Sequence, residues 1–320
     1  MKKLIGISCL LLTALALPAV AQDYPSKAVT LVVPFTAGTG IDNLARAFSE
    51  RQSRKTGQAY VVENKVGVAG NLGAAYVAHQ PGDGYTLLVT SNNLTINNAL
   101  YKNMKFDART DLVPLAIGAW GSSTLVINPA LPIRTVAELV AYAKANPDKL
   151  SYASAGVGSP MHIQFEQFEA ATGTKFVHVP YKGTAPAIAD LIGGHADVGF
   201  IATHSVAQTV KAGQLRALAV GAAERSKVLP DVRTFKEEGF SDFRTDMWYG
   251  FLAPKGTSPA LVTKISQDIA DTLAVPEIKA SLEKTGLEVR YTAPDKMETV
   301  LNKEYTDFAK IISTNNIQIN

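Results

Sequence analysis

The chain has 320 residues, of which 47% are hydrophobic, and a formal net charge of +3. This near-neutral charge excludes the strongly basic surface of a nucleic-acid-binding protein. We expect the densest basic cluster to lie at the solvated end of a helix; it comprises Arg51, Arg54 and Lys55. The length exceeds that of a usual single domain and predicts two domains with a large apolar core.

The first residues have the pattern of a secretory signal peptide. Two lysines precede an apolar stretch, 4–17, and small residues follow up to Ala21. That stretch is shorter than the run of about 20 residues that a membrane-spanning helix needs. We therefore expect a signal peptide at 1–21, cleavage after Ala21 and a periplasmic mature protein. The only cysteine, Cys9, is lost with it, which excludes disulfides and thiol chemistry.

Apolar, β-branched runs alternate with helical patterns in the first part of the mature chain. The sequence predicts strands at 28–33, 59–63 and 85–90, helices after Asp42 and from about Asn71, and a polar loop after Thr90. The alternation of strand and helix is typical of parallel sheets covered by helices.

A second series with the same alternation starts near Leu125. It predicts helices at 136–145, 160–171, 185–192 and 205–211, the first of them capped by Thr135, and strands at 150–153, 175–179, 196–201 and 215–220. An apolar strand at 247–253 and three helical segments that begin near Pro259, Pro276 and Pro294 follow.

These two series predict an α/β fold with two lobes, each a mostly parallel sheet flanked by helices. The chain crosses between them at 125–128 and again near 246–251, so lobe 1 comprises 22–124 plus 247–320 and lobe 2 comprises 125–246. We expect a ligand cleft between the lobes, beyond the carboxyl ends of the strands, that closes by a hinge motion.

Two stretches in different lobes have the same pattern: VTLVVPFTAGTGID at 29–42 and LSYASAGVGSPMH at 150–162. Each is a strand that ends in glycines and then enters a helix. The first amides of a helix lack internal partners, and glycines let an anionic ligand approach them closely. The two loops therefore predict one anion that is held from both sides.

The usual catalytic and cofactor motifs are absent. Both glycine loops begin G-x-G but lack the third glycine of a dinucleotide site, and the sequence has no Walker A motif. G-x-S-x-G is also absent, and Ser159 is best interpreted as a helix N-cap. The five histidines lack metal-ligand spacing. We expect no catalytic residue, no metal and no cofactor.

Several single side chains have two possible roles. Asp42 is expected to stabilise the first loop and to reach a ligand only through water, because it would repel a carboxylate. His162 and His204 lie near predicted strand ends, where ligand contact competes with capping and surface roles. His178 is interpreted as a structural residue in a core strand, and Lys182 as an exposed turn residue.

Several features together resemble the Bug family, the periplasmic solute receptors of tripartite tricarboxylate transporters. They are the leader and the segments 34–42, 154–162, 179–186 with 190–197, and 248–251 with 253–254. The resemblance covers essentially the whole mature chain. It implies a periplasmic binding-protein fold of type II-like architecture that encloses a small carboxylate, held largely by main-chain amides and ordered waters. It also implies membrane permease subunits as partners of a monomeric receptor.

The resemblance and the glycine loops give one set of expected ligand-binding residues: Phe35, Thr36, Ala37, Gly38, Thr39, Gly40, Asp42, Ser91, Asn92, Asn93, Ala155, Gly156, Val157, Gly158, Ser159, His162 and Thr203. The first loop departs from the commoner G-G-x-x-D form of the family. Ile41 is expected to put an apolar side chain near the mouth, which favours an aromatic or medium-chain carboxylate.

Three functions remain open at this point. The first is a carboxylate receptor that needs no catalysis. The second is an exported enzyme on the same fold, with Ser159, His162 or Asp42 in acid or base chemistry. The third is a ligand-sensing module that docks to a membrane signalling protein.

Overall fold

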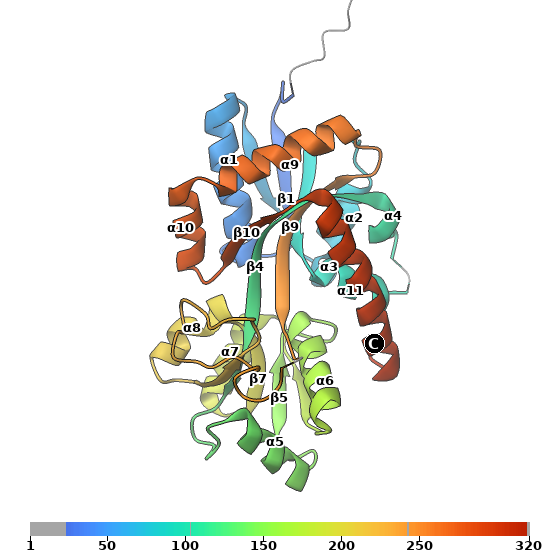
Figure 1. Cartoon of the computed structure of the whole chain (residues 1–320). Coiled ribbons are helices and arrows are strands. Elements are labelled where there is room, and N and C mark those ends of the chain that lie inside the picture. The colour runs from blue at the N-terminus through green and yellow to red at the C-terminus, as the bar shows by residue number, and fades with distance from the viewer. Residues whose placement is uncertain (1–23, 103, 242, 319–320) are drawn as a thin grey trace, which may run out of the picture.

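The computed structural model describes residues 24–102, 104–241 and 243–318, so the expected signal peptide and cleavage site lie outside it. Within these ranges the chain forms a ten-stranded mixed sheet with helices on its faces (Figure 1). No helix of this part of the chain is both long and apolar enough to cross a membrane.

The first half of the chain contains β1 (Val29–Val33), α1 (Gly40–Thr56), β2 (Tyr60–Asn64), η1 (Val68–Gly70), α2 (Asn71–Ala78), β3 (Thr86–Ser91), α3 (Asn93–Leu100), α4 (Ala108–Asp111), β4 (Leu112–Ile127), α5 (Val136–Ala145) and β5 (Ser151–Ser154). The second half contains α6 (Pro160–Thr172), β6 (Val177–Pro180), α7 (Thr184–Gly193), β7 (Val198–Ala202), α8 (Thr203–Lys211), β8 (Arg216–Val220), β9 (Asp246–Pro254), α9 (Pro259–Leu273), α10 (Pro276–Lys284), β10 (Glu288–Thr292) and α11 (Pro294–Thr314).

Most predicted elements are confirmed, and local signals explain their helix starts. Thr135 and Ser159 accept hydrogen bonds from the amides of Glu138 and His162, as N-cap residues do. Helices α6, α9, α10 and α11 each have proline in the first turn, where a missing amide hydrogen is harmless.

The strand order is β2-β1-β3-β9-β4-β7-β5-β6, with β8 and β10 also paired to β4. Pairing is parallel at both ends, between β1 and its neighbours and between β5 and its neighbours. It is antiparallel wherever β4 or β9 takes part. The expectation of mostly parallel sheets is therefore wrong at the centre, because β4 and β9 join the lobes without a crossover helix.

The two lobes share the long strand β4. Its residues 112–122 pair with β9, and its residues 123–127 pair with β7 on one side. Figure 1 shows β4 and β9 passing from the upper lobe toward the lower one. Strand β4 thus changes its pairing partner between Ser122 and Ser123, and the expected crossings and lobe boundaries stay predictions.

The structure has several elements that the sequence analysis did not predict: η1, α3, α4, the part of β4 before Leu125, and β10. Helix α3 occupies the segment that was expected to be a polar loop after Thr90, and β10 pairs with β4. The polar residues of α3 hid it, because they are buried and bonded to other segments: Asn93 and Asn97 both donate to the carbonyl of Ala69.

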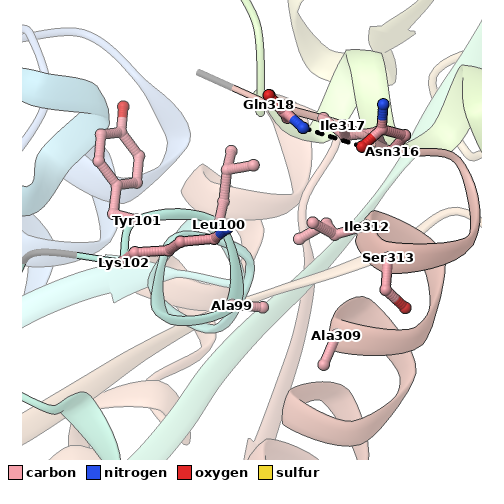
Figure 2. A pocket seen from close by; sticks show the side chains of 10 residues that line it. All are labelled: Ala99, Leu100, Tyr101, Lys102, Ala309, Ile312, Ser313, Asn316, Ile317 and Gln318. Atoms are coloured by element: carbon pink, nitrogen blue, oxygen red, sulfur yellow. Dashed lines mark hydrogen bonds between the residues drawn. The ribbon is translucent and has the colours of Figure 1, made fainter. Parts of the chain in front are cut away.

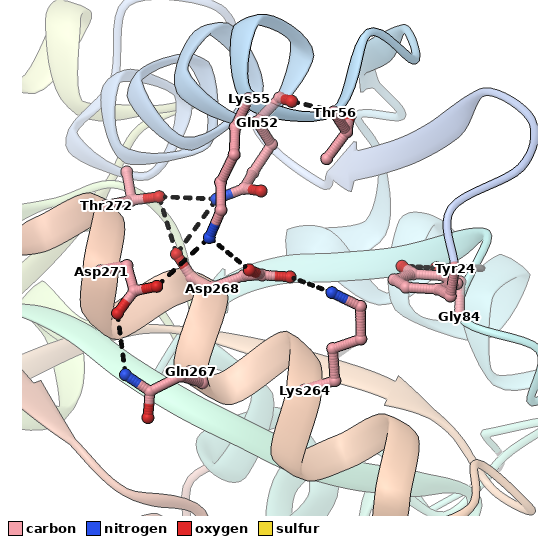
Figure 3. Close-up of polar contacts among 10 residues, drawn as sticks. All are labelled: Tyr24, Gln52, Lys55, Thr56, Gly84, Lys264, Gln267, Asp268, Asp271 and Thr272. Atoms are coloured by element: carbon pink, nitrogen blue, oxygen red, sulfur yellow. Dashed lines mark hydrogen bonds and ion pairs between the residues drawn. The ribbon is translucent and has the colours of Figure 1, made fainter.

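Helix α1 is fixed against α9 by polar contacts, of which the bond between Gln52 and Thr272 is buried (Figure 3). Lys55 Nζ lies 2.9 Å from Asp268 and 3.2 Å from Asp271, and Gln52 Nε2 donates to the hydroxyl of Thr272 over 2.9 Å. Lys55 therefore ties two helices together, while Arg54, its neighbour in the basic cluster, remains exposed.

Helix α11 carries a carboxyl group into the interior of lobe 1. Glu304 Oε2 accepts hydrogen bonds from Thr95 on α3 (2.7 Å) and from the indole N–H of Trp248 on β9 (2.8 Å). Burial raises the pKa of Glu304 to about 7. The carboxyl thus links α3, which follows the expected ligand loop at Ser91, to the strand that joins the lobes.

Glu304→Gln is expected to remove a pH dependence of stability. Because the folded-state pKa lies above the usual 4.5, the native protein loses stability as pH rises from about 4.5 to about 7. The amide oxygen of glutamine still accepts from Thr95 and Trp248 but carries no charge. We expect the variant to be more stable than the native protein by about 3 kcal/mol at pH 8 and nearly equal to it near pH 4.5. Urea unfolding at both pH values checks this, and parallel pH profiles would contradict it.

Candidate functional site

The first glycine loop connects β1 to α1. Thr39 is the N-cap of α1, and Gly38 has a φ of +83°, which suits glycine. The carboxylate of Asp42, 1% exposed, accepts hydrogen bonds from the Gly38 amide (2.8 Å), Asn64 (3.0 Å) and Arg46 (2.8 Å). Asp42 therefore stabilises the loop, as expected.

The charge of Asp42 is held by these donors. Burial alone disfavours its ionised form, but the hydrogen bonds from Arg46, Gly38 and Asn64 outweigh burial and keep the pKa of Asp42 below its ordinary value. The loop is thus fixed by a carboxylate that stays charged and faces inward.

The segment Ser91–Asn93 is connected to the first loop through η1. The carbonyl of Phe35 accepts a hydrogen bond from Asn64 Nδ2 over 2.9 Å. The Phe35 ring is close enough to Gly70 that a Cβ there would lie 3.1 Å from it. The neighbouring carbonyl of Ala69 accepts from Asn93 over 2.9 Å. One short turn therefore holds both expected ligand segments of lobe 1 together.

The second glycine loop connects β5 to α6. Gly156 and Gly158 have φ angles of +121° and +76°, and Ser159 is the N-cap. The Gly158 amide donates to His162 Nδ1 over 3.0 Å, and His162 Nε2 lies 3.5 Å from Glu166. His162 is only 5% exposed, so both ring nitrogens are engaged inside the protein and its ring supports the loop.

A second histidine supports the other glycine. The Gly156 amide donates to Ser154 Oγ over 3.1 Å, and this hydroxyl lies 2.6 Å from His178 Nε2. His178 stacks on His162 with ring centroids 4.1 Å apart. Burial, followed by the proximity of His162, lowers the pKa of His178 to about 4, so this ring is neutral near pH 7. The structural role expected for His178 is confirmed.

The start of α8 lies at the junction of the lobes. Thr203 is 2% exposed, and its hydroxyl donates to the carbonyl of Ser122 on β4 over 2.8 Å. The adjacent His204 faces the start of α1, because a Cβ at Gly40 would lie 3.5 Å from its Cε1. Burial lowers the pKa of His204 to about 4. The neutral ring of His204 therefore separates the starts of α1 and α8.

The second loop meets lobe 1 at α3. A Cβ at Gly158 would lie 2.0 Å from Leu100 Cδ2, so these two residues are in tight contact. A cavity of about 70 Å³ lies near this contact and is lined by Asn92 and by Pro160, which directly follows Ser159. The structure thus places Gly158 against Leu100, and Asn92 and Pro160 in the lining of one cavity. No hydrogen bond among the described residues joins 35–40 directly to 155–159.

Ile41 does not lie where it was expected. It is 5% exposed and packs in the apolar core of lobe 1 with Leu44 and Phe48. Because α1 already begins at Gly40, the side chain of Ile41 turns toward the sheet. The interpretation of Ile41 as an apolar residue at the mouth is therefore wrong, and with it the reason to favour an aromatic or medium-chain ligand.

A wider groove of about 550 Å³ lies elsewhere, between the ends of α3 and α11 (Figure 2). Leu100, Ile312 and Ile317 form its apolar part, and its lining contains none of the expected ligand-binding residues. The sequence reading also missed Gln164 and Arg244, which line the small cavity at the lobe junction. No local motif marks either residue. Gln164 is placed there by the packing of α6 on α11, and Arg244 by the segment that leads into β9.

Comparisons with known proteins give one family. The model of the tripartite tricarboxylate transporter family receptor, TctC, matches residues 44–317. Protein BugT of Bordetella pertussis is 30% identical over 93% of this chain and 92% of its own length. The structure of R. palustris Rpa4515 with adipate has 34% identity and a TM-score of 0.84, covering 92% of this chain and 99% of that one.

A second solved structure, MatC from Rhodopseudomonas palustris with bound malate, has 27% identity and a TM-score of 0.79 and covers 90% of this chain and all of its own. Both structures agree with the α/β periplasmic binding-protein fold described above. The chain therefore belongs to the Bug or TctC family, the solute-binding receptors of tripartite tricarboxylate transporters.

Proposed function

We propose that this chain is an extracytoplasmic receptor that binds a small carboxylate and delivers it to the membrane permease subunits of a tripartite transporter. The observation that carries the proposal is the meeting of helix starts from both lobes. The start of α8 faces that of α1 through His204 and Gly40, and the start of α6 lies beside α3 at the small cavity.

Free main-chain amides support an anionic ligand. In the described residues, the amides of Gly40 and Ile41 in the first loop and of Val157 and Met161 in the second donate to no protein acceptor. Helix starts with free amides attract carboxylates through both hydrogen bonds and the helix dipole. We infer that the expected ligand-binding residues of both loops act mainly through their backbone.

The relatives indicate the ligand class. Rpa4515 was solved with adipate and MatC with malate, and both are dicarboxylates. We propose a small dicarboxylate for this chain as well. Closure of the lobes 22–124 plus 247–320 and 125–246 around it would present a new surface to the permease.

The receptor is proposed to act as a periplasmic monomer after cleavage behind Ala21. An exported enzyme is less well supported, because Ser159, His162 and Asp42 are all engaged in hydrogen bonds that hold the glycine loops. A sensing module would share this ligand site and differ only in its membrane partner, which a pull-down identifies.

A thermal-shift screen of dicarboxylates, tricarboxylates and amino acids tests the proposal. A ligand at 100 times its Kd should add about 2.7 kcal/mol to the free energy of unfolding. Mass spectrometry after incubation should recover the ligand unchanged, whereas an enzyme would convert it. Absence of a shift with every carboxylate would count against the receptor function.

A further inference from the structure

His162, in the first turn of α6, holds the second glycine loop through a single ring nitrogen. The amide of Gly158 donates to Nδ1 of this ring over 3.0 Å, and the residue is only 5% exposed. A ring nitrogen can accept a hydrogen bond only when it carries no proton. The neutral ring must therefore carry its one proton on the other nitrogen, Nε2.

That second nitrogen faces a carboxyl group. Nε2 lies 3.5 Å from Oε1 of Glu166, one turn further along α6, and the same oxygen accepts a hydrogen bond from the hydroxyl of Tyr152 over 3.0 Å. Burial alone would raise the pKa of Glu166, but the contacts with His162 and Tyr152 outweigh burial and keep this pKa below its ordinary value. The charge of Glu166 favours the proton on Nε2 and stabilises a positively charged ring.

A second proton on the ring would disrupt this arrangement. It can bind only to Nδ1, which then becomes a donor and faces the amide donor of Gly158. The buried ring stacks on that of His178, with centroids 4.1 Å apart and planes 10° from parallel, which leaves it little room to rotate. The Gly158 amide would have to turn away, and the neighbouring amides of Val157 and Met161 would move with it.

The other groups that face the ring keep their charge between about pH 8 and pH 5.5. Burial, followed by the proximity of His162, lowers the pKa of His178 to about 4, so that ring stays neutral. Burial raises the pKa of Tyr152 far above neutral. Strand β7, which also packs on α6, has no titratable side chain. A change of charge at this ring in that pH range therefore belongs to His162.

Two more distant carboxyl groups do titrate in the same range. Burial raises the pKa of Glu169, in the last turn of α6, and that of Glu304, on the neighbouring α11, to about 7. Glu169 accepts from the amide of Phe176, and Glu304 is bonded to α3 and β9. Both remain unchanged in the variants below, so a comparison with the native protein cancels their effect.

We propose that His162 is a positioning residue that couples ligand binding to protonation. Only its neutral ring, with the proton on Nε2, holds the Gly158 amide so that the second loop binds a carboxylate, and binding weakens when Nδ1 takes up a proton. The inference rests on the proposed carboxylate-binding function. The receptor then holds its ligand more tightly at neutral pH than in acid.

Titration calorimetry at pH 8 and pH 5.5 tests this, with whichever of adipate and malate gives the larger thermal shift. The native protein should lose about 10-fold more affinity between the two pH values than His162→Asn does, the effect of one lost hydrogen bond. The side-chain oxygen of asparagine can replace Nδ1 as the acceptor for Gly158 but takes up no proton in this range. Protonation of the probe itself affects both proteins equally.

Three further measurements separate this role from a purely structural one. His195→Asn, the same change at an exposed position after α7, should keep the native pH dependence. Glu166→Gln removes the charge that stabilises the protonated ring, so its loss of affinity should move to lower pH. Long-range proton–nitrogen NMR of the native protein at pH 8 should find the proton of His162 on Nε2, without any ligand.

A proton on Nδ1 at pH 8 would overturn the role of His162, and so would an equal loss of affinity in the native protein and His162→Asn. Both results would leave the carboxylate receptor standing. Should His162→Asn not fold or not bind, the profile of Glu166→Gln decides, because an unchanged profile overturns the coupling. If the native protein bound no carboxylate at either pH, the proposed function would fall, and the role of His162 in binding with it.

Discussion

Gly156→Val is expected to weaken carboxylate binding at least 100-fold, which corresponds to about 2.7 kcal/mol. Gly156 has a φ of +121°, a conformation that a β-branched residue rarely adopts, and a Cβ there would lie 3.3 Å from the carbonyl of Tyr181. The loop must therefore change shape, and the amides at the start of α6 move out of position. Calorimetry with the ligand found in the screen measures the loss.

The fold should survive the same substitution. Gly156 is partly exposed, and its backbone is not part of a sheet pairing, so the midpoint of urea unfolding should change only slightly. Lys182→Ala is the matched control, because Lys182 is an exposed turn residue near the same loop. If this control abolished binding and Gly156→Val did not, side-chain charge would hold the ligand in place of the backbone.

Local signals made much of the fold predictable. The prolines and N-cap residues that begin α5, α6, α9, α10 and α11 act within one helical turn, so the sequence alone locates those starts. The strands of the two parallel parts of the sheet, around β1 and around β5, also stand out in the sequence as continuous apolar runs. Predictions of this kind depend only on neighbours in the chain.

The central sheet and α3 depend on contacts between distant segments. The direction of β9 is set by its pairing with β3 and β4, and nothing within 246–254 reveals it. The asparagines of α3 would face solvent in an isolated helix, but here they bond to the carbonyl of Ala69. The sequence therefore indicated a loop where tertiary contacts favour a helix.

The candidate site divides in the same way. The glycine loops were found from their pattern, since a positive φ at the end of a strand requires glycine. The direction of each side chain could not be found from that pattern. Ile41 turns into the core, and His162 turns toward its own loop. Gln164 lies at the lobe junction because α6 packs on α11, and no local signal in the sequence reveals that contact.

Asp42→Ala is expected to lower the free energy of unfolding by about 3 kcal/mol, because it leaves the Gly38 amide and Asn64 without their buried acceptor. Ligand binding should weaken as well, since the first loop loses the group that fixes it. Arg46→Ala is the comparison: it removes one donor but leaves the carboxylate bonded to Gly38 and Asn64, so it should cost less than Asp42→Ala.

The pH dependence of this difference gives a second check on Asp42. Its pKa in the folded protein is lowered, so its contribution to stability is present above the usual value of 3.8 and is lost as pH falls through the folded pKa. The native protein and Asp42→Ala should therefore differ most near pH 7 and converge in strong acid. Urea unfolding at a series of pH values measures both. A difference that stays constant down to the lowest pH would mean that the carboxylate charge is not what holds the loop, because an uncharged acid would then serve equally well.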